Sequence, residues 1–388
     1  MSEQRMQRLD AVDLLRGIAM VLMALDHVRD FFHASRIDPL DLAQTTPLLF
    51  LTRWVTHHCA PAFVFLAGTG AFLSLSRGKT VPQLSRFLLT RGLWLVLLEI
   101  TVVRFGWLFN LDYSLVFAQV IWAIGWSMVA LAGLVFLPRR AIAAVSLGMI
   151  CLHNAFDGVD PAGLGPFAWL WQVLHVQSAI EYAPGWNLFV AYPLIPWIGV
   201  MGAGYLFGRF LLQDEAPRRR SLIRLGLGMI AAFVVLRAVN VYGDPAPWTL
   251  QSGPLRTALS FINTWKYPPS LLYLLMTLGP AIAVLPLLER WKGGAARFIT
   301  VFGRVPLFYY VLHLFLIHAL AVAAAEITTG DAGFLFSNTF PGMGPDAYGF
   351  SLPVVYLVWV VVIGILYFPC RWFADLKRRR KDPWLSYL

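Results

Sequence analysis

The sequence predicts an all-α fold, a polytopic membrane bundle of about ten transmembrane helices with both termini in the cytoplasm. Of the 388 residues, 58% are hydrophobic and only 13% are charged, a balance that soluble domains do not have. Apolar runs of about 20 residues, the length that crosses a bilayer, also recur along the chain. We therefore expect residues 1–388 to form a single transmembrane domain.

The predicted spans are ten apolar runs, taken in the order of the sequence. They lie near residues 11–32, 50–76, 85–104, 113–136, 140–153, 187–211, 222–242, 270–288, 299–324 and 351–373. The fifth run is the shortest, so it either crosses the membrane or enters and leaves on one side. Residues 1–35 resemble a signal peptide at first sight, but Asp13, Arg16 and Asp26 indicate a helix that is retained.

Basic residues separate these runs in an alternating pattern. They gather before the first run, in every second connection, and after the tenth run, where a KRRRK tail ends at Lys381. Cytoplasmic loops carry an excess of Lys and Arg, so the pattern places the N-terminus and the tail inside. The net charge of +10 then predicts anionic membrane lipid as a partner and gives no reason to expect nucleic acid.

The three cysteines and the outer loops are less informative. Cys59, Cys151 and Cys370 are scattered in or beside spans, so we expect neither a disulfide framework nor a metal site. The longest connections, residues 154–186, 243–269 and 325–350, are predicted outside. The first two of them carry five tryptophans that suit either a sugar ring or the membrane interface: Trp169, Trp171, Trp186, Trp248 and Trp265.

Arg16 and His27 are the most informative pair in the first run. Eleven residues of helix separate them by roughly 16 Å and return both side chains to nearly the same face. Ionisable residues inside a span are costly and generally face a protein interior or a wet cavity. We therefore expect two functional groups at two depths of the membrane.

Further polar residues gather at the predicted outer level of His27. Asp30 is one helical turn from His27 and could orient the imidazole as a general base; the alternative is a solvated cluster of Asp26, Arg29 and Asp30 that His27 caps. We expect Arg104 to find a carboxylate of the first span, either as a structural ion pair or as part of the site. His313 lies within one turn of Tyr310, and is either a core histidine or a catalytic one.

Two segments carry a family resemblance. RLDAVDLLRGIAMVLMALDH, followed by THHCAPAFVFLAGTGAFL, resembles the membrane acyltransferases typified by heparan-alpha-glucosaminide N-acetyltransferase, particularly their bacterial relatives. YPPS at 267–270 and GRVPLFYYVLH at 303–313 resemble the same relatives. The more distant type-3 membrane acyltransferases have a similar arginine, ten residues and histidine.

This resemblance implies an enzyme of the bacterial cytoplasmic membrane that moves an acyl group from cytoplasmic acyl-CoA, usually acetyl-CoA, to an acceptor glycan or other small molecule outside. By analogy with the type-3 enzymes, His27 matches their essential histidine and Arg16 its paired arginine. In the heparan enzyme the position of His27 is asparagine and the active histidine lies in the following loop, where this chain has His33. No metal is implied.

The predicted roles combine the residues with the resemblance. The catalytic candidates are His27, Asp26, Asp30, His57, His58, Arg104 and His313. The candidates for the phosphates of the donor are Arg16, Arg77, Arg86 and Arg91, because guanidinium matches phosphate geometry. The candidates for substrate contact are His33, Asn110, Tyr310 and Lys266.

Two alternatives stay open, a secondary transporter and a scaffold or sensor without chemistry; the second would explain the packing glycines but not the clustered His, Asp and Arg residues. A secondary transporter would also have ten spans and buried charges, but should show two related halves, and residues 1–190 do not align with 191–388. Small residues in the second run, among them Gly68 and Gly70, favour close helix packing, which a homodimer could also use.

Overall fold

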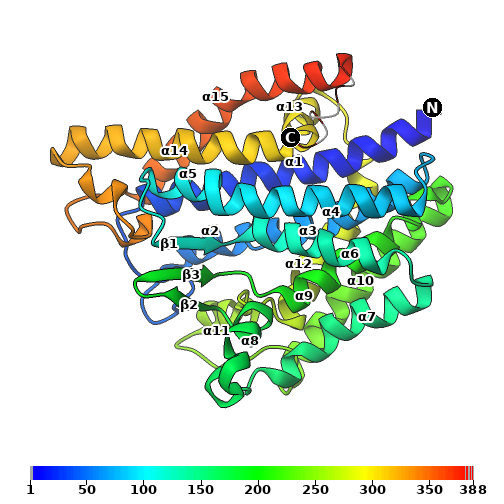
Figure 1. The fold of residues 1–388 in the computed structure, drawn as a ribbon, viewed down its shortest axis with the longest axis horizontal. Helices are drawn as coiled ribbons and strands as arrows, with labels where there is room; N and C mark the ends of the chain where they lie inside the picture. The colour runs from blue at the N-terminus through cyan, green and yellow to red at the C-terminus, as the bar shows by residue number, and fades with distance from the viewer. Residues whose placement is uncertain (1–2, 381, 383–384, 386, 388) are drawn as a thin grey trace. The chain divides into compact units, whose positions relative to one another are not determined.

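The computed structural model describes residues 3–380, 382, 385 and 387; Lys381 of the predicted basic tail lies outside them. The protein is mostly helical, as Figure 1 shows. The chain divides into two compact units: unit 1 consists of residues 1–8, 60–100 and 116–287, and unit 2 of residues 9–59, 101–115 and 288–388.

Unit 1 is built around four helices that lie between residues 59 and 207. These are α3 (Cys59–Leu75), α4 (Val81–Leu98), α6 (Val120–Leu134) and α9 (Leu194–Phe207), with α7 (Arg139–Leu152) packed against α9. In Figure 1, α4 and α6 lie side by side. They approach closely because glycines face each other: a Cβ on Gly92 would lie 2.6 Å from the Gly125 carbonyl oxygen.

The rest of unit 1 consists of shorter elements and two longer helices. They are η2 (His153–Phe156), η3 (Pro161–Phe167), α8 (Ala168–Leu174), η4 (Phe210–Leu212), α10 (Glu215–Val239), α11 (Pro254–Ile262) and α12 (Leu271–Leu288). Strands β1 (Leu115–Ala118), β2 (Ser178–Ala183) and β3 (Trp186–Val190) form a sheet in the order β1-β3-β2. The sequence analysis predicted helix throughout and missed this sheet. Gly185, with a positive φ of 76°, makes the tight turn between β2 and β3.

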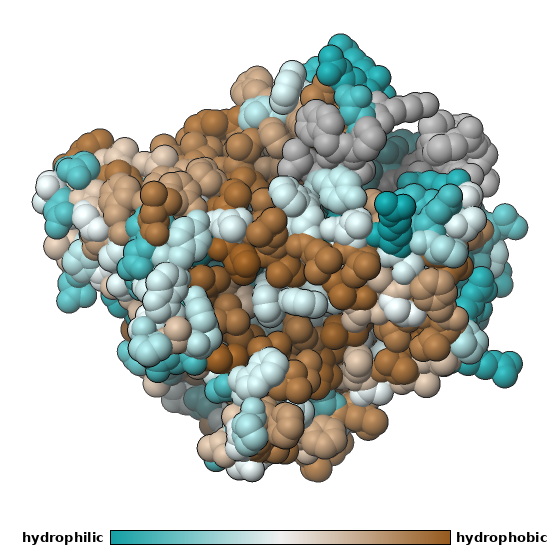
Figure 2. All heavy atoms as spheres, in the orientation of Figure 1, coloured by the Kyte–Doolittle hydropathy of each residue, from teal (hydrophilic) through white to brown (hydrophobic). Residues whose placement is uncertain are grey.

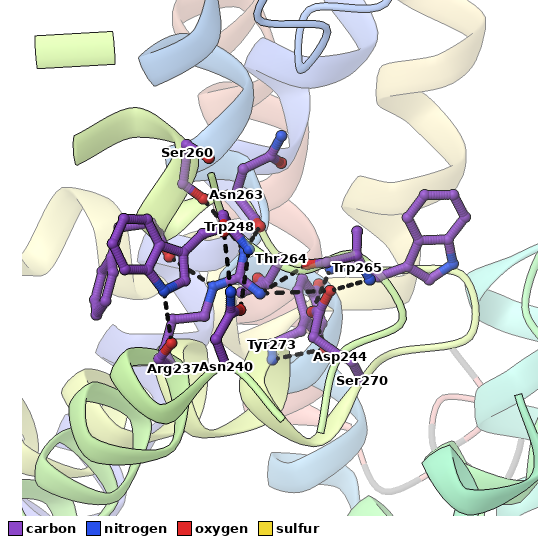
Figure 3. A network of polar contacts seen from close by, with 12 residues as sticks. Arg237, Asn240, Asp244, Trp248, Ser260, Asn263, Thr264, Trp265, Ser270 and Tyr273 are labelled. Carbon is purple, nitrogen blue, oxygen red and sulfur yellow. Dashed lines mark hydrogen bonds and ion pairs between the residues drawn. The ribbon is translucent and has the colours of Figure 1, made fainter. Parts of the chain in front are cut away.

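A network of polar contacts in unit 1 holds the loop after α10 (Figure 3). The Arg237 guanidinium donates to the carbonyl oxygens of Phe261, Ala246, Ser260 and Asn263, and lies 3.7 Å from the Asp244 carboxylate. Burial raises the pKa of Asp244.

The tryptophans of this loop play different parts. The Trp248 indole donates to the Arg237 carbonyl oxygen at 2.8 Å, so Trp248 belongs to the network. The Trp265 indole projects away from it and is 48% exposed. Of these two, only Trp265 presents a ring face that a ligand or lipid could reach.

Unit 2 combines the N-terminal helix with the C-terminal third of the chain. Its elements are α1 (Glu3–Phe32), α2 (Pro47–Thr56), α5 (Arg104–Leu108), α13 (Gly294–Arg304), α14 (Pro306–Thr329), η5 (Gly333–Phe336), η6 (Pro341–Met343) and α15 (Leu352–Arg379). A π-helical turn, η1 (Glu99–Val103), leads from α4 into α5. Helix α14 packs against α5 and α15.

Glycine contacts bring α1 and α13 together. A Cβ added to Gly17 would lie 2.2 Å from the Ile299 carbonyl oxygen, and one added to Gly303 would lie 1.8 Å from the Asp13 carbonyl oxygen. Both distances are far below van der Waals contact. The glycines of the RG motif at 16–17 and the GR motif at 303–304 therefore have a packing role.

Each of the ten predicted runs contains a helix, but several of the predicted boundaries are wrong. The ninth run is broken into α13 and α14 at Pro306, which has no N–H to continue the helix. The second run is broken between α2 and α3 at His57 and His58. Within the described residues, six segments are long and apolar enough to cross a membrane: Pro47–Leu75, Leu194–Leu212, Glu215–Val239, Leu271–Leu288, Pro306–Thr329 and Leu352–Arg379.

The surface agrees with a membrane environment. Figure 2 shows apolar residues over much of the face that it draws. Large apolar side chains such as Val235 on α10 and Leu357 on α15 are 59% and 63% exposed. Contiguous exposed apolar surface on long helices is typical of contact with lipid.

Candidate functional site

The candidate site in unit 2 is centred on two histidines that are 286 residues apart in the sequence. His27 lies near the end of α1 and His313 in the second turn of α14. The His27 Nδ1 atom lies 2.7 Å from the His313 Nε2 atom, which is hydrogen-bonding distance. The two rings are stacked, with centroids 4.9 Å apart.

Backbone contacts determine which nitrogen carries each proton. The His313 Nδ1 atom lies 2.5 Å from the Tyr310 carbonyl oxygen and 3.2 Å from that of Tyr309. A carbonyl oxygen only accepts, so Nδ1 of His313 must be the donor. With His313 neutral, its Nε2 atom is then the acceptor and Nδ1 of His27 the donor. This assignment leaves the lone pair of neutral His27 on Nε2, the nitrogen that can act as a base.

Aromatic side chains enclose this pair. The Trp107 ring meets His27 edge-on at 4.8 Å, and Tyr309 stacks on His313 at 5.4 Å. Trp107 and Tyr309 are 2% and 0% exposed. Within the described part of the chain, the Trp107 Nε1 and Tyr309 hydroxyl atoms make no hydrogen bond. These two buried donors therefore remain available to hydrogen-bond a polar ligand beside the histidine pair.

Trp107 and Tyr309 were not among the site residues predicted from the sequence. Trp107 lies three residues after Arg104, and Tyr309 lies next to Tyr310 and one helical turn before His313, all of which were predicted. Proximity to these residues was the signal that could have found both.

Asp26 and Asp30 form an ionic cluster with two arginines. Asp26 pairs with Arg29 at 2.8 Å and with Arg53, and Asp30 pairs with Arg29 at 2.6 Å. The expected orientation of His27 by Asp30 is therefore corrected: His313 is the partner that the structure shows for the imidazole. The cluster is not solvated either, because Asp26 is 9% and Arg29 6% exposed.

Arg104 lies in a cage of oxygen atoms. Its guanidinium donates to the carbonyl oxygens of Leu115, Asn110 and Asp112 and to the side-chain oxygens of Asn110 and Asn338. The expected ion pair with a carboxylate of the first span is wrong, because these oxygens already occupy the guanidinium. Hydrogen bonds from the backbone N–H and hydroxyl of Ser114 lower the pKa of the exposed Asp112 carboxyl.

The other histidines of unit 2 take separate positions. His33 follows α1, where its Nδ1 atom accepts from the Ser35 backbone N–H at 3.0 Å and burial lowers its pKa. His57 is fully buried at the end of α2. The His58 ring meets the Trp54 ring edge-on at 5.1 Å. The catalytic and substrate roles of these three histidines stay predictions.

The predicted donor-binding residues fall in both units. Arg16 of unit 2 donates to the Asp13 carboxylate at 2.9 Å and to the Gly303 carbonyl oxygen at 3.1 Å, and is half-buried. Arg77, Arg86 and Arg91 belong to unit 1, at the end of α3 and on α4. Their grouping with Arg16 around one ligand therefore stays a prediction.

Lys266 is a buried residue of unit 1. It is 7% exposed, and its ammonium group lies over the rings of Tyr267 and Tyr192, 5.0 and 5.9 Å from their centroids. Tyr310, another predicted substrate contact, is buried in unit 2 with its ring 6.4 Å from that of His27. Asn110 is part of the Arg104 cage.

Comparison with known families decides the class of protein. The model of the heparan-alpha-glucosaminide N-acetyltransferase catalytic family matches residues 8–241, more than half of the chain. The chain belongs to this family. A comparison with curated proteins found no match.

Membership identifies the protein as a membrane acyltransferase and confirms the resemblance on which the sequence analysis relied. The match to the heparan-alpha-glucosaminide N-acetyltransferase family includes His27 and Trp107 and ends before α14. His313 is therefore connected to the matched region by its contact with His27.

Proposed function

We propose that the protein transfers an acetyl group from cytoplasmic acetyl-CoA to an amine or hydroxyl of a sugar at the outer face of a bacterial cytoplasmic membrane. The name of the family, which specifies a glucosaminide, supports an amino sugar as the acceptor. The hydrogen bond between His27 and His313 is the observation that carries the chemistry, because it directs the lone pair of His27 to Nε2.

In this reaction the Nε2 atom of His27 accepts a proton from the acceptor as its nitrogen or oxygen attacks the thioester carbonyl carbon. A new C–N or C–O bond forms. The C–S bond then breaks, and the proton held by His27 goes to the departing thiolate, which leaves as free CoA. His313 does not exchange protons with substrate; it positions His27 through Nε2 and is itself held by the Tyr310 carbonyl oxygen.

The negative oxygen of the tetrahedral intermediate needs hydrogen-bond donors. The Trp107 indole N–H is suited to this role, since it is buried, lies beside His27 and makes no hydrogen bond among the described residues. A donor already in place when charge develops stabilises the transition state without further reorganisation. We assign Trp107 this role in preference to Arg104, whose guanidinium is occupied by its cage.

Acetyl-CoA approaches the site along α1, from the side of His27 on which Arg16 lies. The structure makes α1 a single helix through both residues, so the predicted separation of roughly 16 Å between Arg16 and His27 holds along its axis. A pantetheine arm is of comparable length. To bind phosphate, the Arg16 guanidinium would release the Asp13 carboxylate and donate to the phosphate oxygens instead.

The test uses the full chain in lipid vesicles with acetyl-CoA and an α-glucosaminide, and measures the release of CoA thiol. We expect acceptor-dependent release that falls by at least about 100-fold in His27→Ala. His318→Gln is the matched control, because His318 is a buried histidine of the same unit whose two ring nitrogens lie 3.0 Å from carbonyl oxygens. It should retain activity per folded molecule. Full activity in folded His27→Ala, or solute counterflow without CoA release, would contradict the proposal.

A further inference from the structure

Unit 1 contains a second cluster of histidines, away from the residues used above. His153 begins η2 at the end of α7, Asp157 follows η2, and His175 comes directly after α8. One potential ligand atom from each of the three residues lies within 4.8 Å of the others. The His175 Nε2 atom is 3.2 Å from an Asp157 carboxylate oxygen.

The two imidazoles are buried but not satisfied. His153 is 3% and His175 2% exposed. Among the described residues, no ring nitrogen of either histidine makes a hydrogen bond of normal geometry. The nearest polar groups are the Asp157 carboxylate for His175 and the Pro269 backbone for His153. Buried polar atoms are nearly always well paired, so two poorly paired imidazoles beside one carboxylate leave a place for a further partner. A metal cation fits this place because it accepts a lone pair from each imidazole and from the carboxylate.

The surroundings are built to hold the carboxylate in position. The Asn154 side chain donates to the second oxygen of Asp157 at 2.9 Å, and its own oxygen accepts from the Leu271 backbone N–H at 2.9 Å. The Trp171 ring packs against the His175 ring at 4.8 Å. Such outer contacts orient metal ligands and are a regular part of metal sites.

We propose that His153, Asp157 and His175 bind one Zn²⁺ ion, with a water molecule as the fourth ligand. Two imidazoles and a carboxylate suit zinc, whereas Mg²⁺ and Ca²⁺ prefer oxygen ligands. Ligands at about 2.0–2.1 Å in a tetrahedron lie about 3.4 Å apart, so the side chains close by small rotations.

The bound ion fastens one outer loop of unit 1. It joins the end of α7 to the end of α8 and so closes the segment 153–175, which otherwise has short helices and no disulfide. The sequence analysis predicted no metal because it considered the scattered cysteines. The sequence contained no sign that His153 and His175 meet, because they lie 22 positions apart with several short helices between them.

The experiment titrates the chelator-treated full chain, in detergent, with Zn²⁺ alone and separately with Co²⁺ as a spectroscopic probe. We expect one equivalent to bind and the visible absorption of four-coordinate Co²⁺ to appear. Affinity should fall at least tenfold in His175→Ala and about tenfold in Asn154→Ala, which disturbs only the outer contact. Glu181→Gln, an exposed carboxylate of β2, is the matched control and should bind as the original chain does.

Two results would overturn the proposal. One is a folded His153→Ala, His175→Ala double variant that binds Zn²⁺ as tightly as the original chain. If that variant does not fold, X-ray absorption of the zinc-loaded original protein decides instead. Two imidazole nitrogens at about 2.0 Å support the site, and a spectrum without imidazole rejects it.

Discussion

At the scale of single residues, the backbone of α14 controls the chemistry of α1. The Tyr310 carbonyl oxygen fixes the proton of His313, and His313 in turn fixes the proton of His27. While both rings are neutral, each of these two hydrogen bonds can point in only one direction, because the carbonyl oxygen can accept but not donate. A side chain that reproduces both the donor and the acceptor of His313 should therefore preserve part of its effect.

We expect His313→Gln to retain more activity than His313→Leu. The Gln amide can donate to the backbone carbonyl and accept from His27, whereas Leu can do neither. The loss in His313→Leu should lie in kcat, by about 10-fold to 100-fold, with KM little changed, because His313 does not touch substrate. Acetyl-CoA turnover at several acceptor concentrations measures both constants. Equal kcat values in the two folded variants would contradict the positioning role.

The Arg104 cage predicts a loss of stability. Arg104→Met removes the guanidinium and leaves the oxygens of Asn110 and Asn338 without their charged donor. We expect the free energy of unfolding to fall by about 3 kcal/mol. Thermal unfolding in detergent measures the change. Arg86→Met, at an exposed position of α4, is the control and should change stability by no more than about 0.5 kcal/mol. Equal melting temperatures would argue against the cage.

The sequence offered His27 and His313 as separate candidates but not the contact between them. Helical spacing relates residues within about one turn, and it correctly brought Asp30 near His27. It could not show that Arg29 and Arg53 would bind the carboxylates instead, which they do because a guanidinium ion attracts a carboxylate more strongly than a neutral imidazole does. His313 was a candidate by itself, but its contact spans 286 residues and has no local pattern.

At the scale of helices, glycine contacts set the position of the functional groups. Arg16 reaches the Gly303 carbonyl oxygen because Gly17 and Gly303 allow α1 and α13 to touch. In unit 1, α3 and α9 meet in the same way, with Gly68 against the Met201 carbonyl oxygen. The expected packing role of small residues is confirmed for Gly68. Gly70, two residues later, has no atom within 4 Å of an added Cβ.

These contacts predict that one added methyl group changes the stability of the protein differently at two glycines of α13. Gly303→Ala should lower the free energy of unfolding by about 1–3 kcal/mol or more, because its Cβ would collide with rigid backbone. Gly294→Ala, on the same helix with nothing within 4 Å, should leave stability unchanged or slightly raised. Thermal unfolding of both proteins in the same detergent gives the comparison. A smaller loss in Gly303→Ala than in Gly294→Ala would show that the helices do not meet there.

The apolar runs correctly predicted which parts of the chain contain helices, but several helices end at residues other than those predicted. Pro306 was visible in the sequence, yet a proline in an apolar run can kink a membrane helix or terminate it. The small sheet was missed because Leu115–Ala118 and Trp186–Val190 adjoin helical runs of the same apolar character. Tertiary pairing between distant segments decides such short strands.

At the scale of the whole molecule, the charge pattern predicts on which side of the membrane each loop lies. The basic last turn of α15 and the connection between α3 and α4 should both be cytoplasmic. The critical element is α7, because its 14 residues extend only about 21 Å, less than the hydrocarbon core of about 30 Å. If α7 does not cross, the segment 153–175 and every later loop change sides.

We expect α7 to cross, with the 3₁₀ turn η2 extending it and the bilayer thinning locally to match. In a chain whose cysteines at 59, 151 and 370 are replaced by serine, Arg140→Cys should react with an impermeant maleimide only after the inner face is exposed. Trp169→Cys, in the exposed part of α8, should react from outside in intact cells. Lys79→Cys, which precedes α7 and keeps its side in either case, serves as the reference for the inner face. Labelling of positions 140 and 169 from the same side would mean that α7 returns to the side it left. Because every later loop would then change sides, the segment from 154 to 186 and the KRRRK tail would lie on opposite faces from those assigned by the charge pattern.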